Sequence, residues 1–289
     1  MTDELIVRVP ASSANLGAGF DVFGMALDLY ADVGLGAAPE GAQALDEHHP
    51  ATIALQAAGG RGPCWMRSSI PMGRGLGYSG AARVGGAALG AIAGTSDPEA
   101  ALATRAEEIV DIAAGLEGHG DNAAASYAGG VIAWVAGSPL PLRVGPRLQA
   151  ATVVVWVPDA TTSTDSSRAV LPALVDRSDA VHNLGAVVQM VVAIERDDPT
   201  LLVGATDDRL HQSIRLPGIH GAHEALAAAT GAGAWCGWLS GSGPSIALLA
   251  PTDAVTDVVA ALGASGVGGH TKLLAIATRG AHVLTRRDW

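Results

Sequence analysis

A glycine-rich run, PMGRGLGYSGAA, occupies residues 71–82 of this chain. Glycines let backbone N–H groups approach an anion closely, and the small residues at 80–93 predict a helix whose N-terminus faces that anion. The run lacks the Lys-Ser/Thr pair of the common P-loop and the GxGxxG pattern that opens a βαβ unit. With 38 glycines in the chain, a simple turn before a buried helix is the alternative. The run therefore predicts a nucleotide-binding loop only in combination with other motifs.

Composition and charge narrow the classes of protein that this chain can be. Hydrophobic residues make up 49% of its 289 positions, enough for a core in one large or two modest domains. The net charge of −11 and the lack of a basic run argue against nucleic acid and membrane partners. Cys64 and Cys236 lack metal-ligand spacing, which favours two buried thiols. Without a signal-peptide pattern or a membrane-spanning apolar run, we expect a cytoplasmic protein.

Strands and helices alternate along the chain. Hydrophobic patterning predicts strands at residues 5–9, 28–35, 65–70, 129–136, 148–157, 246–250 and 272–277. Helical periodicity and capping residues predict further helices at residues 51–58, 97–116, 167–174, 179–196, 220–230 and 254–262. Residues 36–50 form a polar interruption, and Pro and Gly cluster at residues 137–147. We therefore predict an α+β fold of two lobes, residues 1–142 and 143–289.

Three further motifs accompany the glycine run. They are PASSANLGAGFDVFGMAL at residues 10–27, which we predict to be a loop between two strands, EGHGDN at residues 117–122 and SGSGPS at residues 240–245. In this order, the four motifs resemble those of the GHMP small-molecule kinases, and most closely the homoserine kinases. The resemblance spans nearly the whole chain.

This resemblance implies both a fold and an activity. The expected fold has an N-terminal ATP-binding lobe like ribosomal protein S5 domain 2 and a ferredoxin-like C-terminal lobe, with the active site between them. The implied activity is phosphorylation of the side-chain hydroxyl of L-homoserine, in threonine biosynthesis, with ATP and Mg²⁺ as cofactors. The implied partner is a small hydroxylated amino acid. The oligomeric state stays open, with a homodimer as one option.

The glycine run is expected to hold the nucleotide phosphates, as in the resembling family. This role falls to Pro71, Gly73, Arg74, Gly75, Leu76, Gly77, Tyr78, Ser79, Gly80 and Ala81. Ser79 is also expected to hold Mg²⁺ with Glu117, since Mg²⁺ prefers hard oxygen ligands. Asp111 or Glu108 could take the place of Glu117. Tyr78 stands where the family usually has a small hydroxyl residue, and we predict that its ring packs beside the phosphates rather than contacting them.

The resemblance also places residues around the acceptor. Asp21 can pair with an ammonium and Asn15 can offer a donor and an acceptor, although both residue types also make turns. Arg215, at the end of DRLHQSIR, is expected to hold the substrate carboxylate with its planar fork. The further expected contacts are Asn122, Thr164, Arg168, Gly241 and Ser242. The expected catalytic set is Ser79, Glu117, Asn122 and Thr164, whereas His119 is expected to be structural.

No catalytic lysine can be identified. Ser12 and Ser13 stand where mevalonate-type relatives carry a lysine, and the chain's only lysine is Lys272. Without a lysine, either the phosphate itself would accept the hydroxyl proton, or positioning of the reactants would suffice for the transfer. Two alternatives remain open: a GHMP kinase for another hydroxylated acid such as threonine or pantoate, and a catalytically silent homologue that binds nucleotide or a partner protein. Tyr78 keeps the silent homologue open, and Ser79 with Glu117 argues against it.

Overall fold

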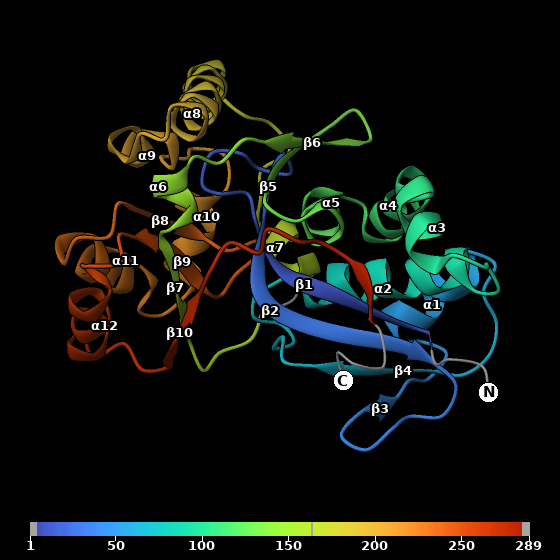
Figure 1. Cartoon of the computed structure of the whole chain (residues 1–289). Coiled ribbons are helices and arrows are strands. Elements are labelled where there is room, and N and C mark those ends of the chain that lie inside the picture. The colour runs from blue at the N-terminus through green and yellow to red at the C-terminus, as the bar shows by residue number, and fades with distance from the viewer. Residues whose placement is uncertain (1–4, 163, 285–289) are drawn as a thin grey trace.

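The computed structural model describes residues 5–162 and 164–284, and its strands form two antiparallel sheets (Figure 1). The first sheet contains β1 (Ile6–Ala14), β2 (Phe23–Leu35), β3 (Gln43–Ala44), β4 (Cys64–Ser68), β5 (Val131–Val135), β6 (Ser138–Leu142) and β11 (His282–Leu284). Its order is β11-β1-β2-β4-β3, and β5 pairs with both β2 and β6. The second sheet, in the order β10-β7-β9-β8, contains β7 (Thr152–Val157), β8 (Cys236–Leu239), β9 (Ile246–Ala250) and β10 (His270–Leu274).

The first motif is mostly strand, so the prediction of a loop over residues 10–27 was wrong. β1 continues through the motif to Ala14, where it pairs with Gly24 of β2, and only residues 15–22 connect the two strands. The polar pair Ser12 and Ser13 does not end the strand, because both hydroxyls are fully buried and hydrogen-bonded to distant side chains. Buried hydroxyls with partners cost little, so a polar pair can continue a core strand.

The helices of the first half are α1 (Pro50–Ala57), α2 (Tyr78–Ile92), α3 (Pro98–Thr104), α4 (Ala106–Glu117) and α5 (Asp121–Ala128). The central helix is α2, whose buried Ala and Gly residues let it pack on β1 and β2 and against α1, α3, α4 and α5. The single helix predicted at 97–116 is instead two helices that meet at Arg105. The Arg105 guanidinium donates to the carbonyl of Ala91 and pairs with Glu108, which stabilises this corner.

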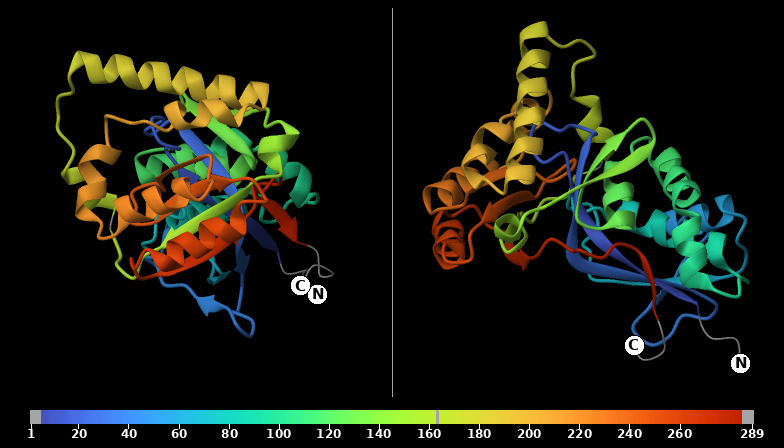
Figure 2. Two further views of the ribbon diagram at one scale, coloured as in Figure 1. Left: turned by 90° about the vertical axis from the view of Figure 1, so that its left-hand side faces the viewer. Right: turned by 45° about the horizontal axis from the view of Figure 1, so that its top comes forward.

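The second half places helices around its sheet. α11 (Ala222–Gly231) and α12 (Val255–Ala264) pack on strands of that sheet. The other helices are α6 (Pro146–Gln149), α7 (Thr164–Ala169), α8 (Arg177–Arg196), α9 (Leu202–Ala205) and α10 (Gln212–Arg215), with 3₁₀ turns at Pro199–Leu201 and Leu216–Gly218. Figure 2 shows α8 as the long helix at the outer edge of this half. No helix in the described part of the chain has the length and apolar character needed to cross a bilayer.

The end of the described chain returns to the first sheet. After β10, the segment crosses to the first half, where β11 pairs with β1 from Leu284 opposite Ile6 to His282 opposite Arg8 (Figure 1). The two halves are therefore joined by a backbone ladder as well as by the chain. The predicted α+β class is confirmed by these mixed layers of helix and antiparallel sheet.

The two cysteines behave as predicted. Both are buried and neither forms a disulfide. Burial raises the pKa of the Cys236 thiol to about 12 and also raises the pKa of Cys64, whose sulfur lies 3.2 Å from the Thr52 hydroxyl. The thiols therefore belong to the core, where burial keeps them protonated.

Candidate active site

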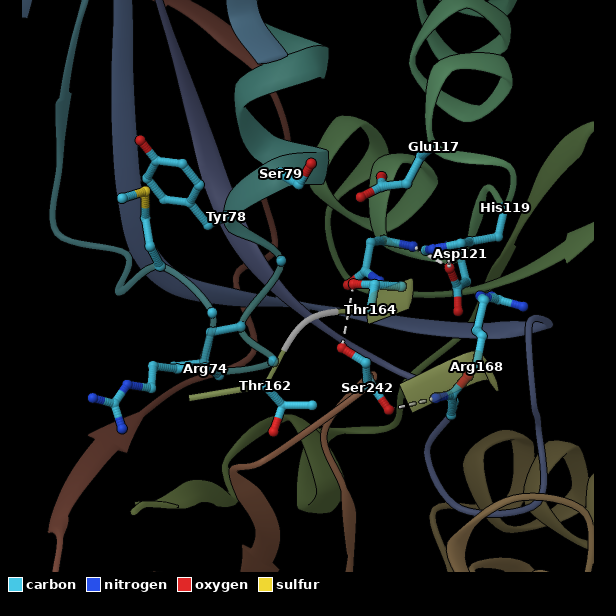
Figure 3. A pocket seen from close by; sticks show the side chains of 18 of the residues that line it. Arg74, Tyr78, Ser79, Glu117, His119, Asp121, Thr162, Thr164, Arg168 and Ser242 are labelled. Atoms are coloured by element: carbon cyan, nitrogen blue, oxygen red, sulfur yellow. Dashed lines mark hydrogen bonds and ion pairs between the residues drawn. The ribbon is translucent and has the colours of Figure 1, made fainter. Parts of the chain in front are cut away.

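A cavity of about 280 Å³ lies between the two halves, where all four motifs meet (Figure 3). The predicted residues that line it are Asn15, Asp21, Pro71, Gly73, Arg74, Gly75, Leu76, Gly77, Tyr78, Ser79, Glu117, Asn122, Thr164, Arg168, Arg215, Gly241 and Ser242. Gly80 and Ala81 do not line it, because they lie in the buried face of α2. Residues that were not predicted, or were not given a role in binding, also line it: Phe20, His49, Pro50, Met72, His119, Asp121 and Thr162.

The glycine run forms a tight loop between β4 and α2. Gly75 and Gly77 have φ angles of +71° and +70°, a region that favours glycine. A Cβ on Gly75 would lie 2.3 Å from the carbonyl oxygen of Ser240, and one on Gly77 would lie 2.1 Å from Ser12 Oγ. The loop is thus held closely between the two halves. The first-turn N–H groups of α2, which have no intrahelical partner, are available to an anion in the cavity.

The loop is also tied to the segment that follows β7. The guanidinium of Arg74 donates to the carbonyl oxygens of Pro158 and Ala160, and the N–H of Thr162 donates to the carbonyl of Gly73 at 3.2 Å. The Arg74 side chain therefore points away from Glu117 (Figure 3) and holds the loop rather than facing the centre of the cavity.

Ser12 and Ser13 connect the motifs. Ser12 Oγ donates to Asn122 Oδ1 at 2.9 Å, and Ser13 Oγ lies 2.8 Å from Ser240 Oγ. Ser240 Oγ in turn donates to the carbonyl of Gly75 at 2.6 Å. These residues join the first motif to the other three. The only hint in the sequence is two adjacent hydroxyls at the end of an apolar strand.

Ser79 and Glu117 face one another across one end of the cavity, from the N-terminus of α2 and the C-terminus of α4 (Figure 3). Glu117 Oε1 lies 3.3 Å from Nη1 of Arg83, which also donates to Ser79 Oγ. Glu117 Oε2 is buried and has no hydrogen-bond partner among the described residues. Burial raises the pKa of Glu117, against the opposing effect of His119 and Arg83. An unsatisfied carboxylate oxygen near a hydroxyl is a donor set that fits Mg²⁺.

The alternatives to Glu117 do not reach the cavity. Asp111 and Glu108 are both exposed on α4, and neither lines the cavity. Glu108 is instead paired with Arg105, and this contact lowers the pKa of its carboxyl. The geometry therefore favours Glu117 as the carboxylate on this side.

His119 and Asp121 form a second polar group beside Glu117. His119 Nδ1 lies 2.8 Å from Asp121 Oδ1, and His119 Nε2 is buried without a partner among the described residues. Burial opposes protonation of His119, but the hydrogen bond and charge of Asp121 outweigh it and raise the pKa. His119, for which a structural role was predicted, thus also lines the cavity. With Asp21, these residues place three ligand atoms within 4.8 Å of one another.

The part of the cavity beside His119 and Asp121 carries two arginines around one aromatic ring. The guanidinium carbons of Arg168 and Arg215 lie 5.5 Å and 5.3 Å from the ring centre of Phe20. Arg168 donates to both carboxylate oxygens of Asp21, one of them at 3.0 Å. Arg215 is buried and its Nε donates to the carbonyl of Ser167 at 2.9 Å; burial, and then the charge of Arg168, lower its pKa. This part of the cavity is built to hold anionic groups beside one carboxylate.

Several of the remaining residues predicted to contact the acceptor already form hydrogen bonds within the protein. Asn15 Nδ2 donates to the carbonyl of Gly241 at 2.9 Å, while its Oδ1 accepts from the N–H of Asp21 at 3.1 Å. The Thr164 hydroxyl lies 3.4 Å from that of Ser242. Asn15 therefore orients both Asp21 and the SGSGPS motif. Its φ of +73° lies in a region that asparagine adopts more readily than most residues.

Tyr78 is turned toward α1. Its hydroxyl lies 3.1 Å from His49 Nε2, and the two rings meet edge to face with centres 6.1 Å apart. Burial raises the pKa of the phenol. The ring lines the cavity on the side away from Glu117 (Figure 3).

Comparisons with known proteins give a family model and similar sequences. Residues 42–130 match the GHMP kinases N terminal domain model. The chain is 40% identical over 261 residues to the homoserine kinase of Moorella thermoacetica, covering 83% of this chain and 86% of that one. It is 36% identical over 283 residues to the homoserine kinase of Thermus thermophilus, covering 93% and 94%.

Solved structures share the fold. The homoserine kinase of Cytophaga hutchinsonii superposes with a TM-score of 0.80 at 24% identity, covering 98% of each chain. The mevalonate kinase of Methanococcus jannaschii gives a TM-score of 0.67 at 12% identity, covering 95% of this chain and 99% of the other. The predicted two-lobed fold is confirmed by these similarities.

Proposed function

This chain belongs to the GHMP kinase family of small-molecule kinases, and we propose that it transfers the terminal phosphoryl group of ATP to the side-chain hydroxyl of L-homoserine. The observation that carries the proposal is a single cavity lined by the glycine loop and by Asp21, Arg168 and Arg215. The curated homoserine kinases that match most of the chain support the choice of acceptor.

The donor end suits phosphates. The loop at residues 71–77 and the first turn of α2 would hold them through backbone N–H groups. Ser79 with Glu117 would hold Mg²⁺, which would supply positive charge to the transferring phosphate. No lysine lies among the described residues that line the cavity. We therefore propose that the chain aligns the acceptor hydroxyl without help from a lysine.

The acceptor end suits an amino acid. Asp21 would bind the ammonium. The ammonium must then share the Asp21 carboxylate with Arg168 or displace Arg168 from it. Arg168 is then free to turn toward an anionic group, and Arg215 would hold the carboxylate. Asn122, Thr164, Gly241 and Ser242 remain the proposed further contacts near the transferring group. An ammonium site beside two arginines favours homoserine over pantoate, which has no ammonium.

We also propose that the chain divides functionally at residue 142. Residues 1–142 would form the ATP-binding lobe, and residues 143–289 would supply most of the acceptor contacts. Asp21 and Asn15 cross this division, since they come from the first motif and contact Arg168 and Gly241 of the second half. Phosphoryl donor and acceptor would thus meet where the halves are tied together.

ADP release across a panel of acceptors tests the proposal. With ATP and Mg²⁺, we expect the highest kcat/KM for L-homoserine, lower values for L-threonine, and little turnover of pantoate. Preference for another hydroxylated acid would reassign the acceptor within the family. ATP binding without turnover of any acceptor would indicate a silent homologue and contradict the proposed activity.

Tyr78 provides a separate prediction about the phosphate loop. The Tyr78 hydroxyl forms a hydrogen bond with His49 and not with the loop. Tyr78→Ser is therefore expected to leave kcat, measured in steady-state assays, close to the wild-type value or to raise it. Tyr78→Phe is expected to leave the ATP affinity unchanged. ATP titrations of both variants by calorimetry check this. A phenol that contacts a phosphate would instead make Tyr78→Phe bind ATP more weakly by about 0.5–1.5 kcal/mol.

A further inference from the structure

We propose that the Arg83 guanidinium lies at the position where Mg²⁺ would bind and competes with the metal for Ser79 and Glu117. This competition weakens the dependence of nucleotide binding on the metal. The inference rests on the proposed nucleotide site. It goes beyond the phosphoryl transfer itself, because it concerns how this chain balances charge when no metal is bound.

Arg83 reaches the position from the same face of α2 as Ser79. The two residues are four apart in the helix, so their side chains lie one above the other. Arg83 Nη1 donates to Ser79 Oγ and lies 3.3 Å from Glu117 Oε1. The Arg83 side chain is only 19% exposed and that of Glu117 only 11%. One guanidinium nitrogen thus stands between the two groups that would hold the metal.

The contact leaves room for a second cation. Arg83 meets Glu117 through a single nitrogen and a single oxygen, whereas a forked pair would use both oxygens. The other oxygen, Oε2, is buried and unpaired within the described chain. Arg83 therefore leaves one carboxylate oxygen of Glu117 without a partner in that part of the chain. An unsatisfied carboxylate oxygen in a shielded site is costly, which favours binding of a second cation. The structure therefore holds a partly neutralised anion that can still accept Mg²⁺.

Metal and guanidinium cannot both bind the Ser79 hydroxyl. Mg²⁺ takes its ligands at 2.0–2.1 Å, and a guanidinium within hydrogen-bond distance of the same oxygen would lie close to it. Like charges at such separations repel strongly in a partly buried site. Binding of the metal must therefore move the Arg83 side chain, and this displacement lowers the apparent affinity for Mg²⁺. Without the metal, the guanidinium would leave a positive charge beside Ser79, at the end of the cavity where the phosphates would bind.

Calorimetry with ADP tests this competition directly. The dissociation constant of ADP is measured with excess EDTA and with saturating Mg²⁺, and the ratio of the two values gives the coupling between metal and nucleotide. For the wild type we expect a ratio of about tenfold or less, at the low end of usual coupling factors. For Arg83→Met we expect the ratio to rise at least about tenfold further, through weaker metal-free binding and tighter metal-bound binding.

Two controls accompany the measurement. Arg105→Met removes an arginine that also pairs with a glutamate on α4 but whose contacts are Ala91 and Glu108 rather than Ser79 and Glu117, and it should keep the wild-type ratio. Arg83→Lys keeps the charge and should give an intermediate ratio. Thermal unfolding shows whether each variant is folded. Should Arg83→Met not fold, the Arg83→Lys ratio and the wild-type ratio still decide the matter.

Several outcomes would overturn the proposal. A ratio in Arg83→Met within twofold of the wild type would mean that Arg83 does not compete with the metal. Equal losses of metal-free and metal-bound affinity would make it an ordinary phosphate contact. A wild-type ratio of about a hundredfold or more would leave no substituting role for the arginine. If Arg83→Met does not fold, an Arg83→Lys ratio equal to that of the wild type counts against it too.

The experiment separates this inference from the proposed function. It uses no acceptor and measures no turnover. A protein that shows the predicted coupling but does not phosphorylate homoserine would contradict the function alone, and an active homoserine kinase with unchanged coupling would contradict the role of Arg83 alone. Failure of the wild type to bind ADP under either condition would overturn both.

Discussion

Glu117→Gln is expected to lower kcat by about two orders of magnitude while leaving the protein folded, in line with the loss of a key electrostatic contact. Glutamine has the shape of glutamate but lacks the charge that a hard cation prefers. Steady-state rates at saturating ATP, Mg²⁺ and homoserine measure the effect, and circular dichroism checks the fold.

The matched control for this prediction is Glu108→Gln. Glu108 lies on the same helix as Glu117, but it is exposed and does not line the cavity. We expect its kcat to stay near the wild-type value. Wild-type turnover in Glu117→Gln would remove Glu117 from the site and reopen the choice of metal ligand.

Arg215→Lys is expected to raise KM for homoserine by about tenfold or more and to change KM for ATP by no more than about twofold. Lysine keeps the positive charge but loses the planar fork that fits a carboxylate. Because Arg215 is buried and donates to Ser167, the unfolding temperature is measured alongside the kinetics.

Arg209→Lys is the control for Arg215→Lys. Arg209 lies in the same DRLHQSIR segment, but it is exposed and pairs with Asp179 outside the cavity, so both KM values should stay unchanged. Equal increases in KM for homoserine and ATP in Arg215→Lys would remove Arg215 from the acceptor end.

Local patterns allowed much of the fold to be predicted. The strand at 246–250 matches β9, and the helix after the glycine run matches α2 to within two residues at its start. These elements depend on neighbouring residues, such as the glycines before α2. The split between α3 and α4 could not be predicted, because it depends on the contact of Arg105 with the distant carbonyl of Ala91.

The cavity-lining residues that belong to a sequence motif were the easiest to predict. The glycine loop, Glu117 and the two arginines all line it. Phe20 was not expected there, because its position between Arg168 and Arg215 depends on the meeting of three distant segments. Arg83 could have been noticed as the residue one turn after Ser79, but its contact with Glu117 depends on the packing of α2 against α4.

Identification of the product shows whether this protein phosphorylates homoserine. The protein is incubated with ATP, Mg²⁺ and L-homoserine, and the product is analysed by ³¹P nuclear magnetic resonance and mass spectrometry. We expect one new phosphomonoester, L-homoserine phosphorylated on its side-chain oxygen, formed in equal amount to ADP. ADP released together with inorganic phosphate, or no phosphorylated amino acid at all, would contradict the proposed activity.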